Sequence, residues 1–403
     1  MGSIDEHWSS FQNMNLETAH AKKIQKVLET ANFTHLCSEA TKIRQEKSLD
    51  AVSCSVNTAK FTYGTYNLVI ALTLSDAIQW VARIMLPQDE EELPEDPINE
   101  DIARSLLSEI ASMNFVRSTT TIPVPRVYGH SAAKNAFGHP YILMEALPGA
   151  VLDNRMALSI PTTHRRKFAA QLAGYIYELS TLQFSKIGCL SYTKSKDLEI
   201  TPFHMSSSWI KPLSTSLEYF YLFRKAQTKE ILSEHPGEQD WESAAWFLER
   251  SLTSMVMEEH LYGPFPLCHL DLHYNNMLVD EDFNITAVLD WSNVQTVPVE
   301  RFIVNPEFVA PPAAPQEYKQ AVFEFRDIFV KELARIERDR KDESDRGMEL
   351  SSLFGSPLAE VVFRCTCSPA RRALFDAQLT LALTYGKDAK WEDFKRFFNQ
   401  RVA

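Results

Sequence analysis

Residues 268–291 read Cys-His-Leu-Asp-Leu-His-Tyr-Asn-Asn-Met-Leu-Val-Asp-Glu-Asp-Phe-Asn-Ile-Thr-Ala-Val-Leu-Asp-Trp. Within this stretch, Asn276 lies five positions after Asp271, and Asp290 closes the next apolar run. Phosphoryl transfer from a nucleotide needs an acid that takes a hydroxyl proton, together with an Asn and a second Asp that hold magnesium. The stretch therefore predicts a phosphoryl-transfer site built on these three side chains.

Two short strands are predicted on either side of the turn at residues 280–284. As an antiparallel pair, they would return Asp290 to the neighbourhood of Asn276. Asp271 would then orient and deprotonate an acceptor hydroxyl, while Asn276 would offer a neutral oxygen to a cation that prefers oxygen ligands. The simpler interpretation is that both Asp residues cap a turn or a strand end. The Asp-x4-Asn spacing alone does not decide between the two, and its combination with Asp290 favours the site.

His269 and His273 flank Asp271 and raise the alternative of a metal hydrolase. A His-x-Asp-x-His run lacks the second cluster of ligands that such a site needs, and Cys268 adds no tetrahedral spacing. The remaining histidines of the chain are isolated from one another. We therefore expect structural or supporting roles for these two histidines.

The chain has 403 residues, which exceeds the size at which a single core stops growing, so two lobes are expected. Hydrophobic residues make up 45% and charged residues 23%, values typical of globular proteins. The net charge of -12 disfavours a nucleic-acid partner, which would require clustered Lys and Arg. An acidic surface suits a cationic acceptor, but it also simply keeps a protein in solution.

Six cysteines are scattered over the long chain, which is not the dense pattern of a secreted disulfide scaffold. The N-terminus has no basic region followed by an apolar run, so no signal peptide is predicted. No apolar stretch reaches the length of a membrane span. These features predict a cytoplasmic protein without a membrane partner; they leave its oligomeric state open.

Three strands are predicted near the N-terminus. Residues 61–74 are rich in β-branched and aromatic side chains, and Gly64 breaks them into two strands around a tight turn. Residues 78–85 follow as a third strand that carries Arg83. A lone glycine often marks a plain turn, but beside this strand it could fold the backbone over nucleotide phosphates. The chain has neither a P-loop nor a Rossmann fingerprint.

An acidic, proline-rich connection at residues 86–101 leads into a predicted helix at residues 99–117. Glu109 falls on the apolar face of this helix at helical spacing from Ile102. A carboxylate inside an apolar stripe needs a partner, because burying an unpaired charge is costly. We expect Arg83 to be that partner.

The remaining sequence predicts a mainly helical region. Residues 122–128 should form an edge strand because their prolines cannot donate to a central ladder, and residues 141–147 should form a buried strand that ends the first lobe. Residues 306–315, with several prolines, read as a linker. Helices are predicted at residues 17–30, before a polar segment that runs to residue 59, and at residues 163–182, 214–232, 241–260, 318–340, 358–364, 370–384 and 391–401.

The order of these elements resembles the aminoglycoside phosphotransferase and choline kinase-like family, especially its large fungal branch. The resemblance covers roughly residues 55 to 300 and is carried by the Gly64 turn, the Arg83 strand, Glu109, the Met144–Leu147 hinge and the stretch from His269 to Trp291. It implies ATP and Mg²⁺, with Asp271 as the catalytic base and Asn276 and Asp290 as metal ligands. It also implies nucleotide contacts from Gly64, Thr65, Asn67, Arg83 and Glu109, and from the backbone of Met144, Glu145, Ala146 and Leu147.

The chain also departs from the protein kinases within this resemblance. Arg83 stands where most kinases have Lys, and the forked guanidinium would hold phosphates differently from an ammonium group. Leu270 replaces the Arg of the His-Arg-Asp loop, Trp291-Ser292 replaces Phe-Gly, and no Ala-Pro-Glu segment follows. Without the parts that phosphorylation switches, a small-molecule acceptor is favoured over a protein.

The resemblance implies an α+β, bilobal, protein-kinase-like fold. It has a small N-terminal antiparallel sheet lobe with one helix and a larger, mainly helical C-terminal lobe. We expect an N-terminal helical extension at residues 1–54, a nucleotide-binding lobe at residues 55–147 and a catalytic and acceptor lobe at residues 148–403. The expected function is a kinase with an alcohol acceptor, either a metabolite or an antibiotic-like molecule. The alternative is a kinase-like protein that binds a small molecule without phosphoryl transfer.

A cationic or aromatic acceptor is one option within this function. The region from residue 201 onward carries Phe203, His204, Trp209, Tyr219 and Tyr221, which could line an aromatic pocket. Aromatic residues at such spacings are more often part of a core, because they are among the commonest buried groups.

Overall fold

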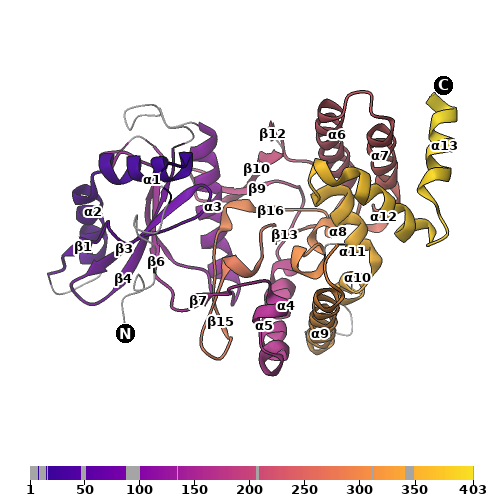
Figure 1. The fold of residues 1–403 in the computed structure, drawn as a ribbon. Helices are drawn as coiled ribbons and strands as arrows, with labels where there is room; N and C mark the ends of the chain where they lie inside the picture. Colours follow the sequence, from indigo (N-terminus) through magenta and orange to yellow (C-terminus); the bar gives the residue numbers. More distant parts are fainter. Residues whose placement is uncertain are drawn as a thin grey trace. The chain divides into compact units, whose positions relative to one another are not determined.

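The structure is a computed structural model that describes residues 8, 15, 17–46, 51–87, 100–133, 135–205, 208–310, 313–340 and 349–402. The chain divides into two compact units (Figure 1). Unit 1 comprises residues 1–150 and 286–292, and unit 2 comprises residues 151–285 and 293–403. Unit 1 is built on an antiparallel sheet and unit 2 is mainly helical, which confirms the predicted α+β class.

The sheet of unit 1 has the strand order β1-β3-β4-β6-β5, and β2 pairs with β3. Every pairing in it is antiparallel, as predicted. The edge strand β5 begins at Val127, five residues later than predicted, because Pro123 and Pro125 precede the ladder instead of joining it. The strands are β1 (Cys54–Val56), β2 (Thr62–Tyr63), β3 (Asn67–Leu74), β4 (Gln79–Met85), β5 (Val127–Ser131) and β6 (Tyr141–Glu145).

Alternate residues of β3 and β4 form the core of unit 1 on one face of the sheet. Trp80, Ala82 and Ile84 of β4 are buried in this core. Side chains along a strand alternate between the two faces, so Arg83 points to the opposite face. The helix α3 (Glu100–Thr119) supplies Glu109 on that opposite face.

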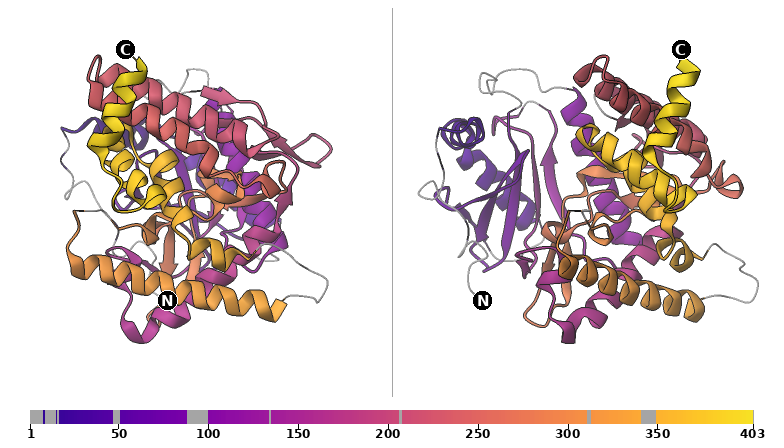
Figure 2. Two further views of the ribbon diagram at one scale, coloured as in Figure 1. Left: turned by 90° about the vertical axis from the view of Figure 1, so that its right-hand side faces the viewer. Right: turned by 45° about the vertical axis from the view of Figure 1, so that its right-hand side comes forward.

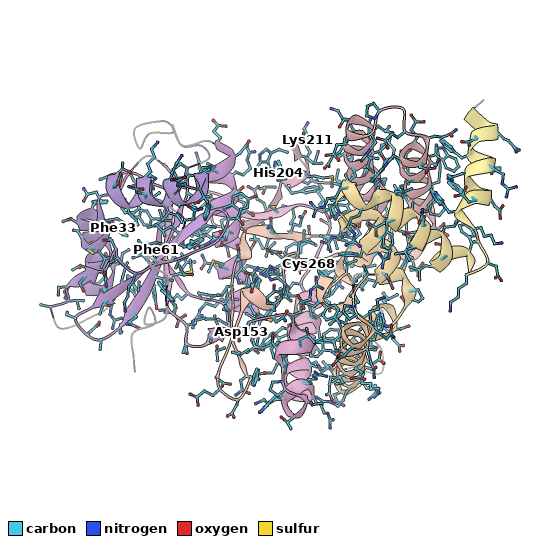
Figure 3. All side chains as sticks on the ribbon, in the orientation of Figure 1. Phe33, Phe61, Asp153, His204, Lys211 and Cys268 are labelled. Carbon is cyan, nitrogen blue, oxygen red and sulfur yellow. The ribbon has the colours of Figure 1, made fainter. Side chains whose placement is uncertain are left out.

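Two helices precede the sheet, α1 (Ala19–Thr30) and α2 (Phe33–Gln45). The first was predicted, whereas α2 was missed because Leu36 and Ala40 are the only two of its residues that are buried. The Asn32 side chain accepts a hydrogen bond from the His35 amide and caps the start of α2. Figure 3 labels Phe33, the first residue of α2, whose ring packs edge-on against Phe137 at 5.5 Å.

Most helices of unit 2 follow the predicted apolar periodicity with small shifts at their ends. The helix predicted at residues 241–260 instead ends at Arg250 and is followed by 3-10 turns at Ser251–Ser254 and Glu258–His260. One pair, α5 and α9, packs side by side, with the rings of Phe168 and Phe325 6.2 Å apart (Figure 2). The predicted linker at residues 306–315 instead begins with a 3-10 turn whose Phe308 is buried. The helices are α4 (Met156–Ser159), α5 (Thr162–Thr181), α6 (Ser216–Glu234), α7 (Gln239–Arg250), α8 (Val299–Phe302), α9 (Gln316–Arg340), α10 (Leu350–Phe354), α11 (Pro357–Val362), α12 (Ala373–Tyr385) and α13 (Trp391–Val402).

Short strands of unit 2 support the loop that carries Asp271. The buried strand β13 (Phe265–His269) lies between β16 (Val294–Thr296) and β8 (Gln183–Phe184) and leads directly into the loop. After the loop come β14 (Met277–Val279), the predicted turn at residues 280–284, and β15 (Ile285–Val288). The sequence did not predict the hairpins formed by β9 (Cys189–Tyr192) with β10 (Leu198–Thr201) and by β11 (Phe203–Met205) with β12 (Ser208–Ile210).

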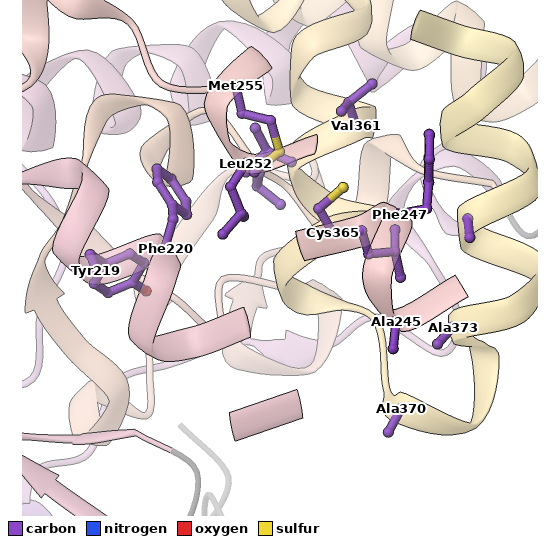
Figure 4. Close-up of a cluster of buried hydrophobic side chains, with 14 of the residues drawn as sticks. Tyr219, Phe220, Ala245, Phe247, Leu252, Met255, Val361, Cys365, Ala370 and Ala373 are labelled. Atoms are coloured by element: carbon purple, nitrogen blue, oxygen red, sulfur yellow. The ribbon is translucent and has the colours of Figure 1, made fainter. Parts of the chain in front are cut away.

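One core of unit 2 is gathered from α6, α7, α11 and α12 (Figure 4). Phe203 and Tyr219 belong to this core, whereas His204 and Tyr221 are exposed. These residues therefore do not form one aromatic pocket, and for Phe203 and Tyr219 the alternative of a core role is correct. Among the described helices, none combines the length and the apolar character of a membrane span.

Two neighbouring aromatic residues of α6 provide a test of this core. Phe220 is fully buried, while Tyr221 is 48% exposed. Replacing Phe220 by Ala should lower the free energy of unfolding by about 3–5 kcal/mol through lost burial and a residual cavity. Tyr221→Ala, the matched control, should change it by no more than about 0.5 kcal/mol. Urea titration followed by fluorescence measures both values. Equal losses would mean that the two faces of α6 are wrongly assigned.

Candidate active site

Arg83 lies in the middle of β4, opposite Val69 of β3 and Ile142 of β6. Its Nη1 donates to Oε2 of Glu109, and its Nη2 donates to Oδ1 of Asp290 at 2.9 Å. The pair with Glu109 is the one that the helical spacing predicts. All three residues belong to unit 1, and together they join the sheet, α3 and the segment at residues 286–292.

The three charges differ in their access to water. The side chain of Glu109 is 5% exposed and that of Arg83 is 12% exposed, whereas that of Asp290 is 36% exposed. Burial alone would lower the pKa of Arg83, but Glu109 and Asp290 outweigh it and raise the pKa, so the guanidinium stays charged. Burial raises the pKa of Glu109, and the Arg83 guanidinium opposes that rise. The charged form of the Glu109 carboxylate is therefore stabilised by Arg83.

Asp290 is held in a defined position by its own neighbours. Its backbone lies in the left-handed region, with φ 56°, which Asp tolerates better than most residues. The Ser292 hydroxyl donates to Oδ1 of Asp290 at 2.7 Å. Trp291 is buried, and its Nε1 donates to the Val288 carbonyl at 2.9 Å. Of the two residues that replace Phe-Gly, Ser292 thus holds the Asp290 carboxylate and Trp291 is fixed by burial and by its bond to Val288.

The turn between β2 and β3 contains the predicted nucleotide-loop residues. The Gly64 N–H donates to the Asn67 carbonyl at 2.9 Å and closes the turn, and Thr65 is exposed within it. A Cβ at Gly64 would meet no atom within 4 Å, so the turn itself does not require glycine. Among the described residues, the buried Oδ1 of Asn67 has no hydrogen-bond partner.

The predicted hinge at residues 144–147 begins in the last two residues of β6. Met144 is buried between β4 and β5. The Glu145 carboxylate accepts hydrogen bonds from the Arg126 N–H at 3.0 Å and is 3.1 Å from Nη1 of Arg117. Its side chain therefore fastens the edge of the sheet, and the partly exposed Ala146 and Leu147 follow the end of the strand.

The loop after β13 holds Asp271 by contacts within unit 2. The Asn276 Nδ2 donates to the Asp271 carbonyl at 2.9 Å and approaches Oδ2 of Asp271 at 3.3 Å. Before Asp271, the loop is anchored by the buried His269, and after it by the buried Leu272. The Asp271 side chain itself is 44% exposed, so the carboxylate remains accessible.

His273 orients the Asp271 carboxylate, as the supporting role expected from the sequence requires. Its Nδ1 accepts a hydrogen bond from the Asn275 N–H at 3.2 Å, which assigns the proton of a neutral imidazole to Nε2. Nε2 in turn faces Oδ1 of Asp271 at 3.4 Å. The hydrogen bond from His273 holds the pKa of Asp271 below its ordinary value, and Asn276 adds to this effect. Asp271 is thus an ionised, exposed and oriented carboxylate.

Asn276 and Asp290 supply the oxygen donors that Mg²⁺ prefers. The Asn276 amide nitrogen faces Asp271, which leaves its carbonyl oxygen available as a ligand. Asp290 directs Oδ1 to Arg83 and Ser292 and offers Oδ2. These donor types fit a magnesium ion. Asp271 and Asn276 belong to unit 2, and Asp290 belongs to unit 1.

Sequence reasoning missed one buried acidic residue of unit 2. Glu307 is 4% exposed and accepts a hydrogen bond from the backbone N–H of Met156 at 3.2 Å. Residues 306–315 were interpreted as a linker because four prolines lie close together there. The sequence did contain one sign of a buried, paired carboxylate, because Glu307 is the single charged residue in the apolar run at residues 306–310.

Comparison with known proteins places these residues in a wider context. Residues 59–299, more than half of the chain, match the family model of the phosphotransferase enzyme family. A subtelomeric hrmA-associated cluster protein of Aspergillus fumigatus is 31% identical over 140 residues, which cover 34% of this chain and 25% of that protein. The clavilactone A biosynthesis cluster protein Y of Ampulloclitocybe clavipes is 28% identical over 246 residues, covering 56% and 57% of the two chains.

The chain therefore spans between a quarter and just over half of the length of these curated relatives. A crystal structure from Ralstonia eutropha, named as an aminoglycoside phosphotransferase, superimposes with a TM-score of 0.54 and 16% sequence identity. The superposition covers 89% of this chain and 99% of that one, and it shows a shared fold.

The Arg83–Glu109 pair leads to a stability prediction. Replacing Arg83 by Met leaves the Glu109 carboxylate buried without its partner and should cost about 3–5 kcal/mol in free energy of unfolding, measured by urea titration. The double variant Arg83→Met/Glu109→Leu removes both charges and should recover most of this loss. A double variant as unstable as the single one would attribute the loss to packing instead of charge.

The contact between His273 and Asp271 leads to a pH prediction. His273→Phe should raise the pKa of Asp271 toward its ordinary value of 3.8, because the hydrogen bond to the carboxylate is lost. In the wild type, the lowered pKa stabilises the folded state near neutral pH, and this contribution fades as pH falls through the folded-state pKa. NMR titration of the carboxyl carbons measures the pKa directly. Asp280, which Asn284 and not His273 holds below its ordinary pKa, is the internal control and should not move.

Proposed function

Because the chain belongs to the phosphotransferase enzyme family, we propose that it is an ATP- and Mg²⁺-dependent kinase that phosphorylates a hydroxyl group of a small molecule. The family match confirms the resemblance drawn from the sequence. The observation that carries the finer proposal is the Asp271 loop, in which an accessible carboxylate is kept ionised and oriented by His273 and Asn276.

In the proposed reaction, Asp271 accepts the proton of the acceptor hydroxyl while that oxygen forms a bond to the γ-phosphorus of ATP. The bond between the γ-phosphorus and its bridging oxygen breaks, and ADP leaves with the electron pair. Asn276 and Asp290 would hold Mg²⁺, which supplies charge neutralisation to the phosphates when bound. Arg83 would contact the phosphates, and Glu109 would hold Arg83 in place.

The nucleotide-binding part of the proposal concerns unit 1. We assign the backbone turn at Gly64, Thr65 and Asn67 to the phosphates, and the segment from Met144 to Leu147 to the adenine. The unpartnered Oδ1 of Asn67 supports a polar ligand near this turn, because buried polar atoms normally find a partner. The corresponding division has a helical extension at residues 1–54, a nucleotide lobe at residues 55–147 and an acceptor lobe at residues 148–403.

The acceptor is proposed to be a metabolite or an antibiotic-like molecule in the cytoplasm. One relative is named for the clavilactone A biosynthesis cluster, which supports a role in small-molecule metabolism. The acidic net charge of -12 keeps a cationic acceptor among the candidates. Burial of Phe203 and Tyr219 in the core weakens the case for an aromatic pocket.

The second candidate is a kinase-like protein that binds a small molecule without phosphoryl transfer. Arg83 in place of Lys is the observation that favours it, since the planar fork of Arg holds phosphates differently from a point charge. Calorimetry with ATP and Mg²⁺ separates the two candidates in combination with a transfer assay. Nucleotide binding without transfer to any acceptor would favour the second candidate, and absence of nucleotide binding would exclude the first.

The transfer assay uses ATP labelled in the γ-phosphate, with a panel of hydroxyl-bearing metabolites and aminoglycosides. Asp271→Asn keeps the size of the side chain and removes the base, so the transfer rate should fall by about 10²–10⁴-fold. Asp282→Ala changes an exposed acid of the turn after β14 and should keep the wild-type rate. Transfer by Asp271→Asn at near wild-type rate would exclude Asp271 as the base.

A further inference from the structure

Arg117 lies in the last turn of α3, the helix that also supplies Glu109. Its guanidinium nitrogen Nη1 donates to the Val124 carbonyl and lies 3.1 Å from Oε2 of Glu145. One nitrogen thus contacts both the backbone of the segment that follows α3 and a carboxylate at the end of β6. The side chains of Arg117 and Glu145 are 34% and 29% exposed, so this contact is partly shielded from water.

The segment at residues 123–126 is bound to Glu145 by two further hydrogen bonds. The Glu145 N–H donates to the Arg126 carbonyl at 2.8 Å, and the Arg126 N–H donates to Oε2 of Glu145 at 3.0 Å. The same carboxylate oxygen therefore receives both the Arg117 guanidinium and the Arg126 backbone. Hydrogen bonds to a charged acceptor are stronger than those between neutral groups. The segment and the first residues of the proposed adenine contact at residues 144–147 are thus held together.

The part of the chain that carries Asp290 is bound to the same region of unit 1. The Val288 N–H donates to the Pro123 carbonyl at 2.9 Å. The Thr286 hydroxyl donates at 2.6 Å to the carbonyl of Pro148, which directly follows the proposed adenine contact. All of these residues belong to unit 1. The segment at residues 123–126 therefore lies between the residues assigned to adenine and those that carry a proposed metal ligand.

The composition of this segment makes it a stiff link. Pro123 and Pro125 have a fixed φ and no backbone N–H. Ile122 and Val124 are 4% and 0% exposed, and the Val124 N–H donates to the Ile122 carbonyl at 2.8 Å. With φ fixed at both prolines, the segment has few torsions that can absorb a displacement of the Val124 carbonyl. Such a displacement is therefore passed on to Pro123 and Arg126.

A simpler role for Arg117 is to stabilise the end of α3, because a basic residue in the last turn interacts favourably with the helix dipole. That role requires no acceptor outside the helix. The Val124 carbonyl and the Glu145 carboxylate both lie beyond α3, in two different parts of unit 1. Arg117 thus connects elements as well as ending one.

We propose that Arg117 is a positioning residue for the nucleotide site of unit 1: it holds the segment at residues 123–126 against Glu145 and so fixes the adenine contact and the Asp290 segment relative to each other. The effect on nucleotide affinity rests on the proposed function, whereas the anchoring does not. A nucleotide that is bound at both places needs them at one fixed separation. Arg117 therefore controls nucleotide affinity through the backbone, without touching the nucleotide.

The first test measures hydrogen exchange in Arg117→Met and in a matched control, Arg44→Met. Arg44 lies in the last turn of α2 and pairs with Asp76 at 2.8 Å, with side chains 25% and 26% exposed, in the same unit. In Arg117→Met, the backbone N–H groups of Arg126 and Val288 should exchange at least about tenfold faster, because the carboxylate and carbonyl that they bind are less firmly held. Arg44→Met should leave both rates unchanged. A wild-type exchange rate at either N–H group in Arg117→Met would overturn the proposal.

Nucleotide binding provides the second measurement. Calorimetry with ATP and Mg²⁺ should give a Kd about tenfold higher in Arg117→Met than in the wild type, the size of effect expected from one lost hydrogen bond. Arg44→Met removes a comparable ion pair from the same unit and should keep the wild-type Kd. Equal values of Kd in the two variants would contradict the positioning role.

A third variant keeps the test decisive if Arg117→Met does not fold. The side chain in Arg117→Gln is shorter and uncharged, so it cannot serve both acceptors, and it should also speed exchange at Arg126 and Val288 and raise the Kd for ATP. Wild-type exchange together with a wild-type Kd in Arg117→Gln would count against the anchor. If the wild-type protein binds no ATP, the proposed function fails, while the exchange measurement still decides whether Arg117 holds the segment.

Discussion

A guanidinium that is largely withdrawn from water must be paired, and Arg83 meets this requirement with two carboxylates from separate parts of the chain. Glu109 is almost fully buried, so the ion pair fixes the rotation of α3 against the sheet. Asp290 keeps more contact with water, so its second oxygen remains available while the first is held. The need to pair the Arg83 charge therefore fixes Glu109 and α3 within unit 1. It leaves one oxygen of the Asp290 carboxylate available for chemistry.

Unit 2 positions its acid by a different physical means. Asp271 has no Arg or Lys partner among the described residues; the hydrogen bonds of Asn276 and His273 orient it instead. A permanent cation would compete for a proton acceptor, whereas hydrogen bonds from an amide and an imidazole can orient a carboxylate and leave it accessible. The buried carboxylate of Glu307, in the same unit, is likewise held by a hydrogen bond, from the backbone N–H of Met156. The two units thus use charge pairing and side-chain hydrogen bonding for two different tasks.

Structural features were predictable from the sequence where one physical requirement governs several residues. The pattern of apolar residues along the chain predicted β3, β4 and α3. The position of Glu109 on the apolar face of α3 then predicted its pairing with Arg83 of β4. The helix α2 escaped prediction because its buried stripe is small, and the hairpins β9–β10 and β11–β12 because their strands have only three or four residues. Glu307 could not be assigned because its partners are backbone groups, which carry no sequence signal. The core positions of Phe203 and Tyr219 depend on the packing of α6, which residue types do not reveal.

The separation of residues 286–292 from the rest of unit 1 in the sequence has a consequence for protein synthesis. Arg83 and Glu109 leave the ribosome in the same early segment, but Asp290 follows Ala150 by 140 residues (290 minus 150). At roughly 5–20 residues per second, this interval lasts on the order of 7–28 s. A nascent chain in this interval carries Arg83 with one of its two carboxylates. Gene fragments that end near residue 150 would encode the same incomplete arrangement permanently.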